Sequence, residues 1–215
     1  MRTFLAAWLL VLVALPMAAV ADARWQAGTH YQVLTTPLST RNPERIEVTE
    51  IFWYGCPHCL SFKPHIDAWA AGRSDDVDYV KLPAVFSRSW EPHARAFYAA
   101  EAMGVLEQAH APLFQALAGE RRNLSDADQL AAYLARHGVS ADEFKRNYNS
   151  FGVNARLQQG NARIRGAQVN GVPAIQGTPS VMVNGKYVTG PSMAGGHEAV
   201  IEVMRYLIEK ERAVN

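Results

Sequence analysis

Apolar residues recur first with the period of a strand, then of a helix, and then of a strand again. Residues 46–54 are rich in β-branched and aromatic side chains and predict a buried strand. Residues 56–71 follow with apolar positions at helical spacing, for example Phe62 and Ile66, and residues 77–82 alternate as a second strand. Because a helix joins the two strands, we expect them to be parallel and their crossover to be right-handed.

The pattern changes in the middle of the chain. Between residues 87 and 167 the periodicity is helical, and no strand is predicted. Ser125 and Ser140 are expected to cap two helices, the second through a Ser-x-x-Glu capping box. Five helices are predicted in this block: residues 91–103, 106–118 and 125–136, a helix that opens at Ser140, and residues 154–168.

Strands return near the end of the chain. Residues 180–183 and 186–188 predict a hairpin around the Asn-Gly pair between them. Residues 197–212 predict a last helix with one apolar face, and a short edge strand is expected at residues 30–34. Strands near both ends of the chain, with helices between them, indicate an α/β fold interrupted by a helical block.

Composition and charge narrow the class of protein. Hydrophobic residues make up 49% of the chain, which allows a sizeable core. The 21 basic and 20 acidic residues leave a net charge of +1. This balance provides no net field of the kind that nucleic-acid binding relies on, so we expect no nucleic-acid partner.

Residues 1–21 have the pattern of a secretory signal peptide. Arg2 supplies the positive charge, residues 4–15 the apolar core, and Ala19-Val20-Ala21 the small-residue cleavage site. The alternative is an uncleaved membrane anchor, but twelve apolar residues fall short of the about 20 that a spanning helix needs. We expect cleavage after Ala21 or Ala23.

Cys56-Pro57-His58-Cys59 contains both cysteines of the chain and opens the first predicted helix. Two intervening residues place the sulfurs in one helical turn, close enough for a disulfide. Free N–H groups and the dipole at the helix start favour a thiolate on Cys56, and His58 can add positive charge. Pro57 fits the first turn because its missing N–H has no intrahelical partner. We expect an accessible, reactive Cys56 and a shielded Cys59.

Two other interpretations of the cysteine pair remain open at this point. A structural disulfide is one, although so short a loop constrains little of the unfolded chain. A zinc site that also uses His58 or His65 is the other, although structural zinc normally has four ligands in paired motifs, and no second cysteine pair exists. We therefore expect no metal. Three further histidines match no metal pattern and are expected in the core or on the surface: His93, His110 and His137.

The strand, the Cys-Pro-His-Cys tetrapeptide and the helix together resemble the active site of the thioredoxin superfamily, and the Pro-His pair resembles its DsbA branch. The resemblance extends over essentially the whole mature chain. It implies a thioredoxin-like fold with an inserted all-helical domain. The implied division is a thioredoxin-like domain at residues 22–86 and 168–215, with the inserted domain at residues 87–167.

The resemblance also implies a substrate-binding loop at Thr178-Pro179. In the family, a cis-proline directly before the strand hairpin lies against the Cys-x-x-Cys, and the preceding residue presents its backbone to the substrate. A trans proline at the start of a strand is the alternative, and Pro173 is a competing candidate. DsbA relatives often have Val-Pro here, so Thr178 departs from the pattern.

Glu50 interrupts an otherwise apolar strand, on the same face as Val48 and Phe52. A buried, unpaired carboxylate is costly, so we expect its pKa to be raised or a partner to be present. The resemblance identifies Glu50 with the family's buried acid beneath the second cysteine, and Lys81 on the next strand is a candidate ion-pair partner. The alternative is that Glu50 faces solvent at a sheet edge.

The function implied by the resemblance is that of an exported, periplasmic thiol:disulfide oxidase. It would pass the Cys56–Cys59 disulfide to newly translocated proteins with free thiols and be reoxidised by a quinone-linked inner-membrane protein of the DsbB type. No dissociable cofactor is implied, and a monomer is expected. The alternatives are a disulfide isomerase or reductase of the same superfamily, or a non-catalytic exported chaperone or metal-binding module.

Overall fold

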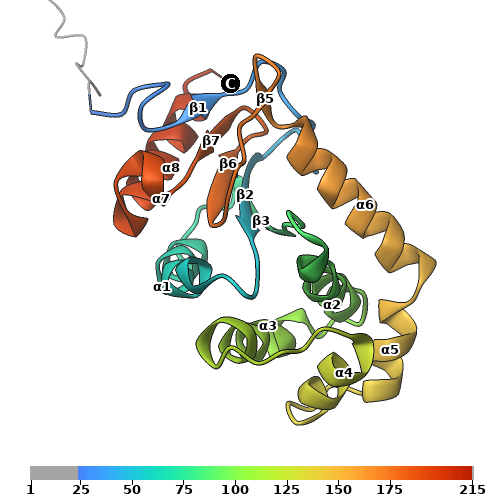
Figure 1. The fold of residues 1–215 in the computed structure, drawn as a ribbon. Coiled ribbons are helices and arrows are strands. Elements are labelled where there is room, and N and C mark those ends of the chain that lie inside the picture. Colours follow the sequence, from blue (N-terminus) through green and yellow to red (C-terminus); the bar gives the residue numbers. More distant parts are fainter. Residues whose placement is uncertain (1–23, 215) are drawn as a thin grey trace, which may run out of the picture.

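A computed structural model describes residues 24–214 (Figure 1). The predicted leader and both expected cleavage positions lie outside the described residues. A five-stranded sheet with the order β1-β7-β6-β2-β3 lies at the centre. Its strands are β1 (Gln32–Val33), β2 (Ile46–Phe52), β3 (Val77–Pro83), β6 (Ser180–Val183) and β7 (Tyr187–Thr189).

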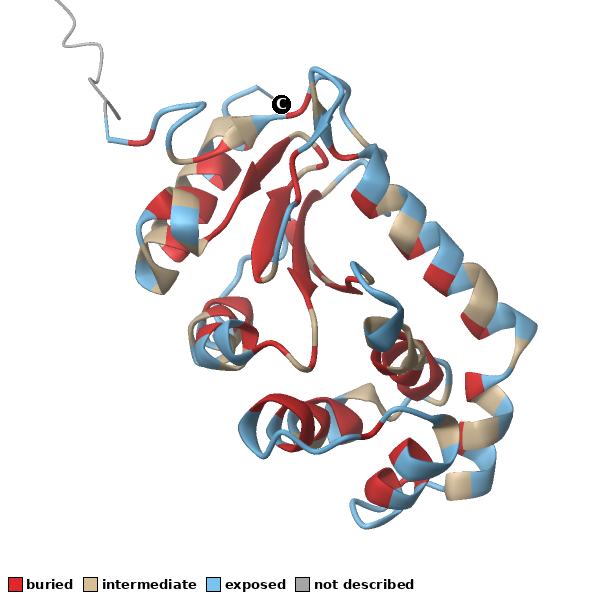
Figure 2. Cartoon of the chain, in the orientation of Figure 1, coloured by how far each residue is buried: buried red, intermediate tan, exposed pale blue. Residues whose placement is uncertain are grey.

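Strand β2 lies inside the sheet, between β6 and β3, and all of its residues are buried (Figure 2). It pairs in parallel with β3 and antiparallel with β6. The predicted parallel pair is thus confirmed, and so is the predicted C-terminal hairpin, because β6 pairs antiparallel with β7. The register places Glu50 opposite Lys81 on one side and opposite Val181 on the other.

Helices cover both faces of the sheet. The described helices are α1 (Pro57–Ala71), α2 (Glu91–Ala102), α3 (Leu106–Phe114), α4 (Ala127–Ala135), α5 (Ala141–Tyr148), α6 (Phe151–Gly166), α7 (Pro191–Ala194) and α8 (His197–Arg212), with a 3₁₀ turn at Arg88–Trp90 and a π-helical turn at Gln115–Gly119. On one face, Val181 of β6 packs in a cluster with Phe62 of α1 and Leu207 of α8. On the other face, its neighbour Met182 packs in a cluster with Ile164 of α6. Successive strand residues therefore supply two separate cores, as the alternation of a strand requires.

The segment between β3 and the β4–β5 hairpin is helical, as predicted, and α2 to α5 enclose a third core below the sheet (Figure 1). Phe97, Phe114 and Phe144 of these helices are fully buried in it. The same cluster contains Phe52 at the end of β2 and both cysteines. The core of the helical segment is therefore continuous with the surroundings of the cysteine pair.

Several element boundaries differ from the sequence prediction. Helix α4 is capped by Asp126, whose side chain accepts the N–H of Gln129 at 2.9 Å, so the prediction of Ser125 as the cap was wrong. Ser140 caps α5 as expected. Helix α6 begins at Phe151 because the Ser150 side chain accepts the N–H of Val153 at 3.2 Å.

A small hairpin follows α6 and was not predicted. Its strands β4 (Gln168–Val169) and β5 (Val172–Pro173) pair with each other and join no other strand. Asn170 and Gly171 form the turn with positive φ angles of 50° and 80°. Two-residue strands carry too short an apolar pattern to be recognised, although the Asn-Gly pair is a hairpin signal.

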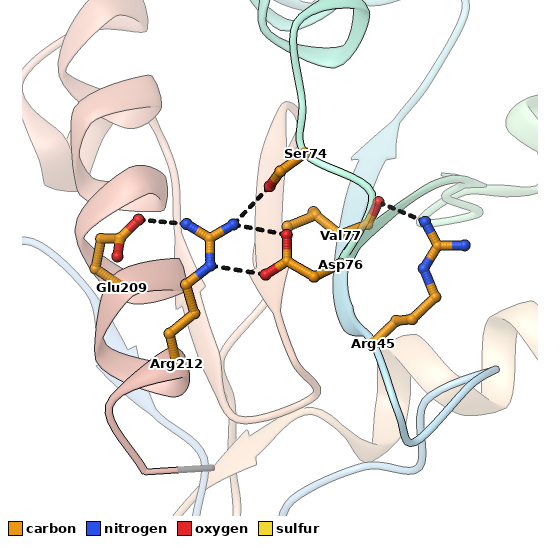
Figure 3. A network of polar contacts seen from close by, with 6 residues as sticks. All are labelled: Arg45, Ser74, Asp76, Val77, Glu209 and Arg212. Atoms are coloured by element: carbon orange, nitrogen blue, oxygen red, sulfur yellow. Dashed lines mark hydrogen bonds and ion pairs between the residues drawn. The ribbon is translucent and has the colours of Figure 1, made fainter.

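The C-terminal end of α8 is fixed to the turn between α1 and β3 (Figure 3). Arg212 donates two hydrogen bonds to the Asp76 carboxylate, at 2.7 and 2.8 Å, and one to the Ser74 hydroxyl at 2.5 Å. This fork holds the pKa of Asp76 well below its usual value. The contacts attach the last helix to the strand that lies next to β2. No helix in the described part of the chain is long and apolar enough to cross a membrane.

Candidate active site

Cys56 is the N-cap of α1, and its sulfur faces the first turn of that helix. Its backbone is extended (φ −90°, ψ 113°), and Sγ accepts the N–H of Cys59 at 3.4 Å. Pro57 occupies the first helical position, where its missing N–H leaves no intrahelical bond unmade. Both cysteines are thiols in this structure. The sequence pattern of strand, tight loop and helix start thus brings the two sulfurs together as predicted.

The two thiols differ in burial. Cys59 is fully buried, whereas 7% of the Cys56 surface is exposed. The expectation of a shielded Cys59 is confirmed, but Cys56 is more covered than we expected. The reason is the Thr178 loop, which lies close enough for the Cys56 thiol to donate a hydrogen bond to the Thr178 carbonyl oxygen at 3.3 Å.

The surroundings separate the acidities of the two thiols. A hydrogen bond from the Cys59 thiol, supported by the backbone N–H groups of Cys59 and His58, lowers the pKa of Cys56 to about 5, although burial acts in the opposite direction. Burial and the nearby Cys56 sulfur raise the pKa of Cys59. At neutral pH the pair therefore consists of a thiolate at Cys56 and a protonated thiol at Cys59.

The Thr178–Pro179 bond is cis, as expected, and is the one cis bond among residues 24–214. The competing residue Pro173 lies in the exposed hairpin strand β5. Thr178 and Pro179 line a cavity of about 380 Å³ together with His58 and His197. The two histidines are the titratable residues among those that line this cavity.

Glu50 is 2% exposed, so it does not face solvent. Burial raises its pKa to about 7. The expected ion pair with Lys81 is not present: Lys81 pairs with Glu107 of α3 at 3.5 Å, and the hydroxyl of Tyr79 donates to Glu50 instead. Tyr79 lies two residues before Lys81 on β3, so its side chain is on the same face of the sheet as Glu50. Lys81 still acts on Glu50 through its charge.

Sequence reasoning missed three residues around the thiols. His197, the first residue of α8, has its ring 5.5 Å from that of Phe62 and 5.7 Å from that of His65, both on α1. Tyr54 is 1% exposed and its hydroxyl is 2.8 Å from Nδ1 of His110 on α3. The position of Tyr54, two residues before the first cysteine, could have indicated that it lies near the thiols. Its partner His110 is 56 positions later, and the sequence does not indicate that the two residues meet.

Position 55, next to Cys56, is a glycine because the ring of Trp53 leaves no room there for a side chain. A Cβ at position 55 would lie 2.3 Å from that ring, which stacks on Trp90 at a centroid distance of 4.1 Å. Trp53 Nε1 donates to Nδ1 of His93 at 2.9 Å. The loop before the cysteines is therefore held by aromatic contacts with the helical segment that follows β3.

Comparisons with known proteins agree with this geometry. The DSBA-like thioredoxin domain family matches residues 79–199. The thiol:disulfide interchange protein DsbA of Pseudomonas aeruginosa is 40% identical over 197 residues, which cover 92% of this chain and 90% of that protein. The corresponding protein of Azotobacter vinelandii is 37% identical, covering 90% of this chain and 88% of its own length.

Solved structures give the same result. The crystal structure of Pseudomonas aeruginosa DsbA superposes with a TM-score of 0.83 at 38% identity, covering 88% of this chain and 96% of that chain. The oxidoreductase DsbA from Xylella fastidiosa superposes with a TM-score of 0.78 at 32% identity, over 87% and 98% of the two chains. At this identity and coverage, the chain belongs to the DsbA family of thioredoxin-fold thiol:disulfide oxidoreductases.

Proposed function

We propose that this protein is an oxidase that passes its Cys56–Cys59 disulfide to newly exported proteins. The observation that carries the proposal is the opposite perturbation of the two thiols, with Cys56 held as a thiolate and Cys59 as a thiol. A stabilised thiolate favours the reduced enzyme, so the disulfide tends to leave for a substrate. A reductase needs the reverse tendency.

The reaction proceeds in two exchanges. A substrate thiolate attacks Sγ of Cys56, forms a mixed disulfide and displaces Cys59, which takes up a proton because its pKa is raised. A second substrate thiolate then attacks the substrate sulfur of the mixed disulfide and displaces the Cys56 thiolate. Two electrons pass from the two substrate thiols to the enzyme, and the substrate gains one disulfide.

Five other residues have proposed roles. Pro57 and His58 shape the helix start and the charge beside Cys56, and His58 also lines the 380 Å³ cavity. Thr178 and Pro179 form the substrate-binding loop, which the hydrogen bond between Cys56 and the Thr178 carbonyl supports. Glu50 serves as the buried acid near Cys59. It interacts electrostatically with Lys63, one helical turn after Cys59 on α1.

The proposed context follows from the same assignment. The chain is exported by its leader to the periplasm, with cleavage after Ala21 or Ala23, and acts there as a monomer on unfolded proteins with free thiols. A quinone-linked inner-membrane protein of the DsbB type reoxidises it, and no dissociable cofactor takes part. Residues 22–86 and 168–215 form the thioredoxin-like domain, and residues 87–167 form the inserted one.

Equilibration of the purified protein with mixtures of reduced and oxidised glutathione tests the oxidase proposal. We expect the protein to be mostly reduced at ratios at which an ordinary structural disulfide stays oxidised. A protein that stays oxidised until reductant is in large excess would contradict the oxidase proposal and would fit a reductase or a structural disulfide instead. Alkylation at pH 6 supplies the matching test of roles, because Cys56 is ionised there and Cys59 is not: Cys56→Ser should abolish fast labelling, and Cys59→Ser should leave a labelled thiol.

A further inference from the structure

A second cavity lies at the junction between the sheet and the helices that follow β3. It has a volume of about 580 Å³ and is formed by the loop at residues 38–41, by α2 and by α6. Figure 1 shows α6 passing along the outside of α2 from the helical segment to the sheet. None of its lining residues lines the cavity beside Cys56.

The hydroxyl of Tyr98 lies in this cavity without a hydrogen-bond partner among the described residues. Tyr98, on α2, is 5% exposed. Gly160 of α6 leaves room for the hydroxyl, because a Cβ at position 160 would lie 2.3 Å from it. Burial raises the pKa of Tyr98, so the phenol keeps its proton at neutral pH and is available as a donor.

A second unpartnered donor is the Nε of Arg163, which is buried and makes no hydrogen bond. The other nitrogens of this guanidinium are occupied: Nη1 donates to the Ser39 carbonyl at 2.7 Å, and Nη2 binds the Glu47 carboxylate. A buried donor that lacks an acceptor, as this nitrogen does, is costly. Tyr98 of α2 and Arg163 of α6 both line the cavity.

The charges around the cavity leave one cation unmatched. Glu47 is 1% exposed and is bound by Arg163, and Glu101 is paired with Arg156 at 2.9 Å. Arg41 also lines the cavity and makes no ion pair with any residue between 24 and 214. Both acidic groups are therefore already neutralised, and the guanidinium of Arg41 has no counterion within the described chain.

We propose that this cavity binds a small oxyanion, a phosphate or a carboxylate. Its ligands are the Tyr98 hydroxyl and the guanidinium groups of Arg41 and Arg163, which supply donors and positive charge from three different segments. Arginine and hydroxyl donors in a partly closed site are the groups that hold such anions. A bound anion joins the 38–41 loop, α2 and α6, so it stabilises the folded protein independently of the thiol chemistry.

Thermal unfolding of the oxidised protein tests this proposal. Sodium phosphate and sodium malonate are each added at 1 to 20 mM, roughly the range in which specific sites fill before salts act by exclusion, against sodium chloride at equal ionic strength. Arg41→Gln and Tyr98→Phe remove two of the donors, and Gly160→Ala fills the space in front of the hydroxyl. Arg165→Gln is the matched control, because Arg165 is also on α6 but does not line the cavity.

We expect phosphate, malonate or both to raise the melting temperature of the parent by several degrees, with saturation, and the responding anion identifies the ligand class. Arg165→Gln should keep the response, whereas Arg41→Gln and Tyr98→Phe should require at least several-fold more anion. Arg41 is exposed, so its variant is informative even if Gly160→Ala fails to fold. A parent that melts equally in all three salts overturns the proposal. An equal shift in the parent and in both donor variants also overturns it, because it would be a general salt effect.

Discussion

The thiol of Cys56 donates to the carbonyl oxygen of Thr178 across 3.3 Å, although the two residues are 122 positions apart in the chain. This bond exists only while Cys56 carries its proton, because a thiolate and a carbonyl oxygen are both acceptors. Ionisation of Cys56 therefore frees the Thr178 carbonyl. Cys56 carries no proton in the disulfide form either, so in the proposed mechanism this carbonyl is free to pair with an extended substrate segment when the substrate attacks.

The reduced protein should be more stable than the oxidised protein at neutral pH. The pKa of Cys56 is about 5 in the folded state, against about 8.5 in an unfolded chain. A depressed pKa stabilises the folded state fully above the unfolded value, and this contribution is lost as the pH falls through about 5. As the pH rises between these two limits, the free energy of unfolding of the reduced form should increase, relative to that of the oxidised form, by at most about 1.4 kcal/mol per pH unit.

Urea unfolding of both redox forms between pH 5 and pH 8 measures this effect. The oxidised form has no thiol to titrate and serves as the reference for all other groups. Reduction should also raise the melting temperature at pH 7, opposite to the loss of a structural disulfide. An oxidised form that is the more stable one throughout this range would contradict the oxidase proposal.

Glu50→Gln should make the protein more stable than the parent at neutral pH. The pKa of Glu50 is raised from 4.5 to about 7, so its contribution to stability is fully present below pH 4.5 and is lost as the pH rises through 7. The side chain of the variant stays neutral. Its free energy of unfolding should therefore rise relative to that of the parent by about 1.4 kcal/mol per pH unit in this interval. The oxidised protein should be used, so that the thiols do not titrate. Glu107→Gln, at an 88% exposed side chain, is the control and should show no such dependence.

His197 should make the protein a stronger oxidant at acidic pH. Burial and the charges of His65 and His58 lower the pKa of His197, while the Cys56 sulfur raises it. A protonated His197 therefore favours the Cys56 thiolate. In glutathione equilibria, His197→Gln should reduce the oxidising tendency roughly twofold at pH 6, as expected for a partly exposed charge pair, and should have no effect at pH 8.

His65→Gln provides a control of opposite sign. It removes a positive neighbour of His197 and should slightly increase the oxidising tendency at pH 6. Equal pH profiles for the parent and both variants would exclude an electrostatic role for His197. The charged groups that act on this imidazole are those of His58, His65 and Cys56.

Tyr54→Phe should lower the free energy of unfolding by about 1–3 kcal/mol, because it leaves the ring nitrogen of buried His110 without its partner. The double variant Tyr54→Phe/His110→Leu should recover part of this loss. Tyr98→Phe is a matched control, since its hydroxyl has no partner among the described residues and its removal should be nearly neutral in the absence of an anion. Chemical denaturation measures all three.

The sequence was informative where chemistry depends on neighbours along the chain. The strand predicted at residues 46–54 is present at Ile46–Phe52, and the helix predicted at residues 56–71 is present at Pro57–Ala71, with Cys56 as its N-cap. Burial of Glu50 was also predictable, because its side chain points to the same face as the apolar Val48 and Phe52 of a buried strand.

The partners of these residues were harder to predict. Glu50 is bonded to Tyr79 rather than paired with Lys81, because Lys81 reaches a carboxylate of α3 that no strand pattern places there. His197 and His110 approach the site from helices α8 and α3, far away in sequence. Their contribution depends on how helices pack, which the period of apolar residues does not specify.

The core shared by the helical segment and the cysteine pair limits how far the two can be separated. Phe52 at the end of β2 contacts Phe97 of α2 and Phe114 of α3, and Cys59 belongs to the same cluster. Transplanting the tetrapeptide onto a thioredoxin fold without this segment would remove the aromatic side chains that share this cluster with the two cysteines. We therefore expect that transferring these four residues alone would not transfer the redox properties of the site. Substitutions in the helical segment can therefore change the surroundings of both cysteines while the Cys-Pro-His-Cys sequence stays the same.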